Sequence, residues 1–306
     1  ECTLLSPDAG HATSAPWSPY GLRPALDLAP LLVDLVRTAE TAGLEIEQVH
    51  HEYGHDQLEV SLAPSDPVSA ADSVVLARIV LGRVAARHGL LVSFSPVPFV
   101  GEAGNGAHLH LSLTDESGPV LTGGDGPHGL TTTGQQAMAG ILHGLPELLG
   151  VYAGSVLSEH RLKPGNWAGA AACWGLENRE AAVRLVTATP GNPHGANVEL
   201  KVVDPSANPY LAVTALLGSA ELGVERELEL PPEVPVDPAK AGVVLPWLPV
   251  DETEAVEALA SSALAERLLG APIIEGLVSV RRHEIDAYGL LEPAVTARAL
   301  RLAWSC

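Results

Sequence analysis

Three predicted strands each carry an acid or an imidazole in the middle of a polar face. Alternate residues of a strand share a face, so His108, His110 and Ser112 lie opposite the leucines of AHLHLSL. Glu59 is central on the polar face of QLEVSL, and Glu199 on that of NVELKV. Carboxylates with one or two imidazoles are suitable ligands for Mg²⁺ or Mn²⁺, whereas a structural zinc site usually contains cysteines. The pattern predicts a divalent-metal site.

The alternative for each strand is an ordinary solvated face of an antiparallel sheet. Solvated faces usually favour Thr, Lys and Ser, whereas these faces carry His and Glu, and they do so in three separate segments. Glu52, in HHEY, adds a further acid shortly before Glu59. The repetition favours the metal site, although a solvated face remains the alternative interpretation for any single strand.

Three arginines supply positive charge in one short stretch. Arg161, Arg179 and Arg184 lie close in sequence, although the chain holds only 17 Lys and Arg residues. Each alone is compatible with a surface ion pair. Guanidinium groups near a divalent metal are also what a nucleotide polyphosphate or a carboxylate substrate needs. The sequence has neither G-x-x-x-x-G-K-[ST] nor G-x-G-x-x-G, so any ATP would be held by metals and arginines.

Composition limits the class of protein. The 306 residues are 46% apolar, enough for one large domain or two small ones. A net charge of −20 argues against nucleic acid or an anionic membrane as a partner. Cys2, Cys173 and Cys306 lie far apart, as expected for free thiols in a reducing cytosol. We therefore expect a cytoplasmic protein.

The pattern of elements indicates the fold class. Helices are predicted at residues 29–42, 67–88, 133–151 and 209–224 and over much of 252–304, with Asp66 and Asn208 as N-caps. Residues 6–28 are predicted to form a loop, and Arg161 is placed in a Pro-Gly loop. Strand segments come in adjacent pairs between the long helices, which predicts an α+β fold with a largely antiparallel sheet covered by helices.

Five segments, in the same order, resemble the catalytic domain of the glutamine synthetase family: HHEYGHDQLEV, GNGAHLHLSL, HRLKPG, ENREAAVRL and NVELKVVDPSANPYLAVTALL. The resemblance covers nearly the whole chain, so residues 1–306 are interpreted as one such domain. It implies a curved, mostly antiparallel sheet backed by helices, in a parent protein that forms a homo-oligomeric ring. The family's N-terminal β-domain is absent from this sequence, and we expect the isolated chain to be inactive.

The resemblance also implies roles for single residues. Divalent metal, Mg²⁺ or Mn²⁺, would be bound at one site by Glu1, Glu52 and Glu59 and at another by His108 and Glu199. The nucleotide, ATP, would contact His110, Ser112, Arg179 and Arg184. Glutamate would contact Gly104, Arg161 and Lys201. The implied catalytic residues are Arg161, Arg179 and Trp167.

The implied reaction has two steps: ATP phosphorylates the side-chain carboxylate of glutamate, and an amine then displaces phosphate. Trp167 stands six residues after Arg161, where ammonia-using members carry a glutamate. An indole cannot pair with a cation as a carboxylate does, although its face attracts alkylammonium groups. The sequence therefore predicts a ligase that joins glutamate to an alkylamine or polyamine.

Three alternatives remain open at this point. The chain could use ammonia, as ordinary glutamine synthetases do, or it could be an inactive structural or regulatory relative. Lys201 favours the inactive alternative, because it stands where the family usually has an arginine and lysine lacks the bidentate fork. Trp167 itself could simply pack beside its loop.

Overall fold

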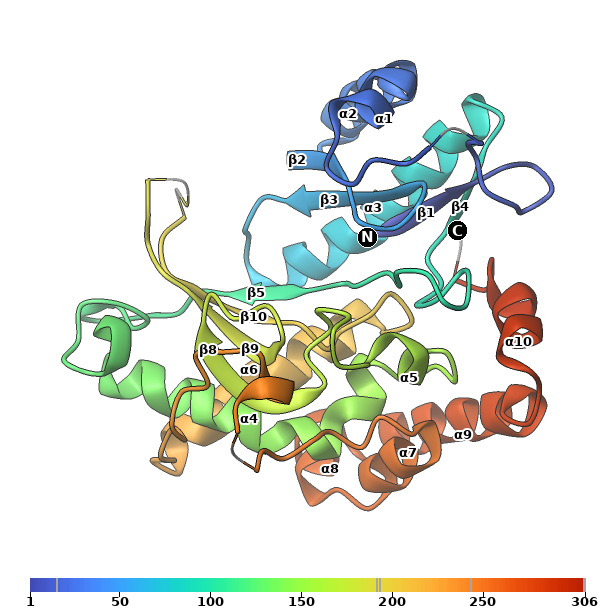
Figure 1. Cartoon of the computed structure of the whole chain (residues 1–306). Coiled ribbons are helices and arrows are strands. Elements are labelled where there is room, and N and C mark those ends of the chain that lie inside the picture. The colour runs from blue at the N-terminus through green and yellow to red at the C-terminus, as the bar shows by residue number, and fades with distance from the viewer. Residues whose placement is uncertain (15, 191, 193, 243, 305–306) are drawn as a thin grey trace. The chain divides into compact units, whose positions relative to one another are not determined.

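The computed structural model describes residues 1–14, 16–190, 192, 194–242 and 244–304. The chain divides into two compact units (Figure 1): Glu1–Asn105 with Leu291–Cys306, and Gly106–Leu290. Each unit holds a four-stranded sheet and a hydrophobic cluster of its own. The predicted α+β architecture of helices and mostly antiparallel sheet is confirmed. Among the described helices, none combines the length and hydrophobicity needed to cross a bilayer.

The sheet of the first unit is antiparallel throughout. Its strands, in spatial order, are β2 (Ile46–His51), β3 (Gln57–Leu62), β1 (Cys2–Leu5) and β4 (Leu91–Ser93). The helices of this unit are α1 (Leu22–Asp27), α2 (Ala29–Ala42), α3 (Pro67–Arg87) and α10 (Pro293–Leu300). Leu58 of β3 packs in one cluster with Leu35 of α2 and Val84 of α3. Glu59, its neighbour in sequence, therefore points away from that cluster, as the alternation predicted.

Local sequence signals explain two helix ends in this unit. The Asp66 carboxylate accepts hydrogen bonds from the amides of Val68 and Ser69, both at 3.2 Å, which confirms it as the N-cap of α3. Gly43 ends α2 with a left-handed φ of 73°. The loop prediction for residues 6–28 was wrong in part, because α1 lies within it. This helix is six residues long and has no side-chain cap, so it offers neither periodicity nor a capping signal.

The second unit has a mixed sheet. In spatial order its strands are β5 (Leu109–Leu111), β10 (Asn197–Leu200), β9 (Ala181–Val186) and β8 (Ala171–Leu176). The first three are antiparallel, whereas β8 runs parallel to β9. A small hairpin, β6 (Thr114–Asp115) and β7 (Gly118–Pro119), follows β5. The helices are α4 (Thr132–Tyr152), α5 (Ser158–Arg161), α6 (Pro209–Glu225), α7 (Glu252–Ala260), α8 (Ala263–Leu269) and α9 (Ala271–Tyr288), with 3-10 turns at Pro127–Gly129 and Pro238–Lys240.

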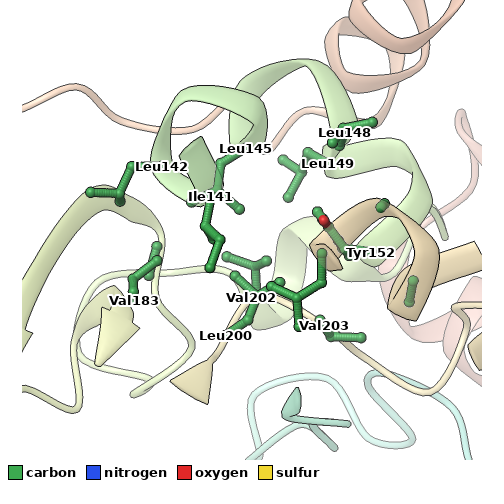
Figure 2. Packing of buried hydrophobic residues seen from close by; sticks show 14 of the residues in the cluster. Ile141, Leu142, Leu145, Leu148, Leu149, Tyr152, Val183, Leu200, Val202 and Val203 are labelled. Carbon is green, nitrogen blue, oxygen red and sulfur yellow. The ribbon is translucent and has the colours of Figure 1, made fainter. Parts of the chain in front are cut away.

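Helix α4 covers the apolar face of this sheet. Figure 2 shows Ile141 and Leu145 of α4 directed at Val183 of β9 and Leu200 of β10, and all four are buried in one cluster. Helix α6 can approach α4 closely because Gly140 has no side chain: a Cβ there would lie 2.1 Å from the Ser219 carbonyl oxygen. This packing fixes which face of β10 points into the core and which face is left for polar residues.

The first residue of α7 predicts a pH-dependent stability. Glu252 is 6% exposed, and burial raises its pKa to about 9 despite the opposing charge of Arg281. Because the folded-state pKa lies above the unfolded value, the stability that protonated Glu252 contributes is complete below about pH 4.5 and is lost as pH rises towards 9. We expect Glu252→Gln to stabilise the chain by on the order of 2–4 kcal/mol near pH 8 and by little near pH 5.

Thermal unfolding of the Glu252→Gln variant at both pH values measures this effect. Glu254→Gln is the matched control, because Glu254 lies in the same helical turn and is exposed. An equal gain at both pH values would show that Glu252 is not held protonated by burial.

Candidate functional site

The polar face of the second sheet is organised around Glu199. The strand register places Glu199 directly opposite His110 of β5 and opposite Arg184 of β9. Residues directly opposed in an antiparallel pair share a face, so an acid lies in one row between an imidazole and a guanidinium. Val198 and Leu200, on either side of Glu199, are buried in the core. The alternation predicted for this strand is therefore confirmed.

Glu199 and Lys201 are each only 4% exposed, so a solvated face is the wrong interpretation for β10. Arg184 Nη1 donates a hydrogen bond to Glu199 Oε2 at 3.1 Å. Lys201 Nζ lies 3.3 Å from Glu199 Oε1, and His108 Nδ1 lies 3.2 Å from the same oxygen. The structure thus brings together four of the predicted site residues in a buried ion cluster.

The pKa shifts follow from this cluster. Burial alone would raise the pKa of Glu199, but its neighbours His108, Lys201, His110 and Arg184 outweigh that effect and hold the pKa well below its usual range. Burial lowers the pKa of His108 far below its usual range, and the neighbouring Lys201 and Arg161 add to that effect. Glu199 is therefore a permanent anion at neutral pH, and His108 is a neutral ring.

Arg161 is buried against the end of β10, the strand that carries Glu199. It is the last residue of α5, which comes directly before the Pro-Gly loop, so the prediction that it lies in that loop was wrong. Its guanidinium donates to the carbonyls of Val202 at 3.0 Å and Lys201 at 2.9 Å, and Nη2 lies 3.3 Å from His108 Nε2. Because a guanidinium only donates, His108 Nε2 accepts, and Nδ1 carries the hydrogen that faces Glu199. Both ring nitrogens of His108 are engaged within the protein.

The predicted nucleotide residues lie at the margin of this cluster. His110 Nδ1 is 2.9 Å from Asn197 Oδ1, and the Ser112 hydroxyl donates to the carbonyl of Ala196 at 3.1 Å. Arg184 pairs with Glu177 as well as with Glu199. Arg179 is exposed in the turn between β8 and β9, as predicted from its Asn-Arg turn. His110 and Ser112 are also exposed.

Trp167 lies on a loop that two contacts hold in place. Its own amide and the amide of Gly165 donate to the Glu180 carboxylate, at 3.0 and 3.2 Å. Gly169 has a left-handed φ of 78° and lies so close to β9 that a Cβ would be 2.9 Å from Ala182 Cα. Trp167 is nevertheless 45% exposed. It is therefore not a residue that packs into the core, and its ring is accessible.

A second group of acids lies in the first unit, described here by itself. His50 of β2 is the register partner of Glu59 of β3. His50 Nε2 lies 2.9 Å from Glu52 Oε1 and 3.7 Å from Glu59 Oε2. One ligand atom from each of these three residues falls within 4.8 Å of the others. The Tyr20 hydroxyl donates to Glu52 Oε2 at 2.8 Å.

These acids are poorly neutralised by the chain itself. Burial, together with the nearby carboxylates of Glu1 and Glu52, raises the pKa of Glu59 to about 8. Acids gathered in this way favour a bound cation or a proton, so the group fits a divalent metal ion. Gln57 connects the group to Gly104, because its Nε2 donates to Glu1 Oε2 at 3.1 Å and to the Gly104 carbonyl at 2.9 Å.

The pair His108 and Glu199 is less suited to bind a metal ion than the acids of the first unit. Arg184 and Lys201 already neutralise Glu199, and both nitrogens of His108 have protein partners. A metal ion could bind there only by displacing some of these contacts. On the donor set alone, the acids around Glu59 are the better metal site.

Sequence reasoning missed three residues of these clusters: His50, Tyr20 and Glu177. His50 has the same strand parity as Glu52, and this signal could have found it. Tyr20 and Glu177 reach the clusters from a loop and a turn, where no periodicity indicates the direction of a side chain.

Comparison with known proteins identifies the family. The model of the glutamine synthetase catalytic domain matches residues 5–298. The chain therefore belongs to the glutamine synthetase family.

Individual relatives refine the comparison. The chain is 37% identical over 289 residues to the gamma-glutamylpolyamine synthetase of Streptomyces coelicolor, covering 92% of this chain and 62% of that protein. It is 31% identical to the glutamine synthetase of Clostridium saccharobutylicum, over 83% of this chain and 58% of that protein. The crystal structure of a novel glutamine synthase homolog superposes with a TM-score of 0.85 at 31% identity, over 98% of this chain and 68% of that one. The chain thus spans less than two thirds of the length of these two curated relatives.

Proposed function

We propose that the chain is the catalytic domain of an ATP-dependent ligase that joins the γ-carboxylate of glutamate to an alkylamine or polyamine. The accessible indole of Trp167, at 45% exposure, is the observation that carries the choice of amine. It occupies the position at which the resemblance implies an acid in ammonia-using members. The similarity to a gamma-glutamylpolyamine synthetase supports the same class of substrate.

In the first step a glutamate γ-carboxylate oxygen attacks the γ-phosphorus of ATP, and ADP leaves. In the second step the amine nitrogen attacks the carbonyl carbon of the γ-glutamyl phosphate, phosphate leaves, and the nitrogen loses a proton. Arg161 and Arg179 serve as catalytic arginines in this proposal. Bound Mg²⁺ or Mn²⁺ would neutralise charge on the transferred phosphoryl group. Its ligands would come from Glu1, Glu52 and Glu59, and from His108 and Glu199.

The substrates occupy the residues that the resemblance assigns. Glutamate is held by Gly104, Arg161 and Lys201. The phosphates and nucleotide of ATP are held by Arg179, Arg184, His110 and Ser112. The exposed guanidinium of Arg179 supports a site for anionic substrates, because guanidinium groups bind phosphate and carboxylate groups.

The assembly and location of the protein are part of the same proposal. We propose a homo-oligomer, and a cytoplasmic location in which thiols stay reduced. Cys2 and Cys173 are free and buried, which supports the location. Cys306 lies outside the described residues.

A second candidate function is ligation of ammonia, because one of the similar proteins is a glutamine synthetase. Phosphate release that depends on both ATP and glutamate, measured with ammonium, ethanolamine, putrescine and spermidine, separates the candidates. We expect a γ-glutamyl amide of the alkylamine or polyamine, identified by mass spectrometry. Glutamine as the main product would establish the ammonia ligase. Binding of ATP and glutamate without phosphate release by the native-length protein would establish an inactive relative.

Metal binding gives a further test of the proposed site. Replacing Glu52 and Glu59 together by Gln is expected to weaken Mn²⁺ binding at least about tenfold, because these acids supply the uncompensated charge. Isothermal titration calorimetry measures the affinity. Glu47→Gln, an exposed acid on the same strand as His50, is the matched control and should bind Mn²⁺ normally. Wild-type affinity in the double variant would show that Glu52 and Glu59 do not bind the metal ion.

A further inference from the structure

A cluster of metal-ligating side chains in the first unit is not used by the proposed reaction. It consists of His11, His55 and Asp56, and one ligand atom from each lies within 4.8 Å of the others. His11 Nδ1 is 3.4 Å from Asp56 Oδ2, and His55 Nε2 is 3.7 Å from the same oxygen. Neighbouring ligands around a tetrahedral ion with bonds of about 2.0–2.2 Å lie roughly 3.3–3.6 Å apart. The two nitrogen–oxygen distances are therefore close to those around a bound ion.

One polar atom at the centre of this cluster, Nδ1 of His11, faces a buried carboxylate without a hydrogen bond in the described part of the chain. Asp56 is 0% exposed. His11 Nδ1 is buried and has no hydrogen-bond partner among the described residues. The opposite ring nitrogen, Nε2, lies 3.2 Å from Glu102 Oε1. If Nε2 carries the hydrogen and donates it to Glu102, then the lone pair of Nδ1 faces a buried carboxylate oxygen, and a cation between the two resolves the conflict.

The surroundings hold the ligands in orientation. The amide and hydroxyl of Thr13 donate to Asp56 at 3.2 and 2.8 Å. The ring of His11 contacts the rings of Phe99, at a centroid distance of 4.1 Å, and of His55, at 4.6 Å. An imidazole ligand whose second nitrogen donates to a carboxylate is a recurring arrangement in zinc sites, where it fixes the tautomer and the ring plane. Glu102 stands in that position to His11.

We propose that His11, His55 and Asp56 bind a divalent ion of the zinc class, with Glu102 as a positioning residue for His11 and with water as the fourth ligand. Two imidazoles and one carboxylate favour Zn²⁺, Co²⁺ or Ni²⁺ over Mg²⁺, which prefers oxygen ligands. His55 Nε2, at 3.1 Å from the Thr13 hydroxyl, must present its lone pair to become a ligand, so the bound ring carries its hydrogen on Nδ1. This site does not depend on the proposed ligase activity, since none of its residues belongs to the ligase site.

The test uses the whole chain without a histidine tag, stripped with a chelator and titrated with Zn²⁺ against a chromophoric competitor. We expect one tight Zn²⁺ per chain, and His11→Gln and His55→Gln each to weaken it at least about tenfold, with a similar or smaller loss for Glu102→Gln. His143→Gln, an exposed imidazole on α4, is the matched control. Glu59→Gln should retain the site, which separates it from the Mn²⁺ site.

Co²⁺ substitution of the wild-type chain gives a second readout that needs no variant. A tetrahedral site of two imidazoles and a carboxylate should produce intense visible d–d absorption, whereas octahedral Co²⁺ absorbs weakly. Weak absorption, no tight Zn²⁺, or tight Zn²⁺ that survives both histidine variants would each overturn the proposal. So would loss of Zn²⁺ in Glu59→Gln with retention in His11→Gln and His55→Gln.

Discussion

Glu199→Gln is expected to lower the free energy of unfolding of the second unit by about 3–5 kcal/mol. The substitution removes the anion from a buried cluster and leaves Lys201, 4% exposed, and the guanidinium of Arg184 without their shared partner. An uncompensated buried charge costs far more than the loss of a surface ion pair. Urea denaturation followed by circular dichroism, in the presence of a chelator, measures the change without a contribution from bound metal.

Glu177→Gln is the matched control for this prediction. Glu177 also pairs with Arg184, but its side chain is 45% exposed, so we expect its loss to cost about 1 kcal/mol or less. Both variants remove an acid from the same arginine, but only Glu199 is buried and also pairs with Lys201. Equal effects of the two variants would contradict the view that the burial of Glu199 makes the cluster important for stability.

The fold could be predicted from the sequence wherever apolar residues repeat with a clear period. The alternation of Val198, Leu200 and Val202 correctly predicted the core face of β10, and Asp66 and Asn208 correctly predicted two helix starts. The short helices α1 and α5 were missed. They are six and four residues long and lack side-chain caps, so their formation depends on tertiary packing and not on local signals.

The candidate site could be predicted only in part, because alternation tells which residues share a face and not what covers that face. Glu199 and Lys201 were correctly placed on one side of β10, but their burial could not be foreseen. Their burial depends on segments distant in sequence, since Arg161 is held by the carbonyls of Lys201 and Val202. For the same reason the pairing of His50 with Glu59 could not be predicted, because it follows only from the strand register of the structure.

Trp167→Glu is expected to shift amine selectivity towards ammonium in the proposed ligase. An alkylamine gains about 0.8 kcal/mol for each methylene buried on the indole, and its ammonium group gains roughly 0.5–2 kcal/mol from a cation–π contact. Because the indole is 45% exposed before the amine binds, its surface is accessible for these contacts. Two or three methylenes with the cation contact amount to on the order of a hundredfold preference, and Trp167→Glu should remove most of it.

The measurement is the ratio of kcat/KM for the best alkylamine to kcat/KM for ammonium, before and after substitution. We expect the ratio to fall chiefly through the alkylamine, since the carboxylate cannot replace the lost apolar contact. Trp247→Glu is the matched control, because Trp247 belongs to the same unit and is 48% exposed. The left-handed φ of 52° at Trp167 applies to both residue types equally, so backbone strain does not confound the comparison. A ratio that stays within about twofold, equivalent to about 0.4 kcal/mol, would show that Trp167 does not select the amine.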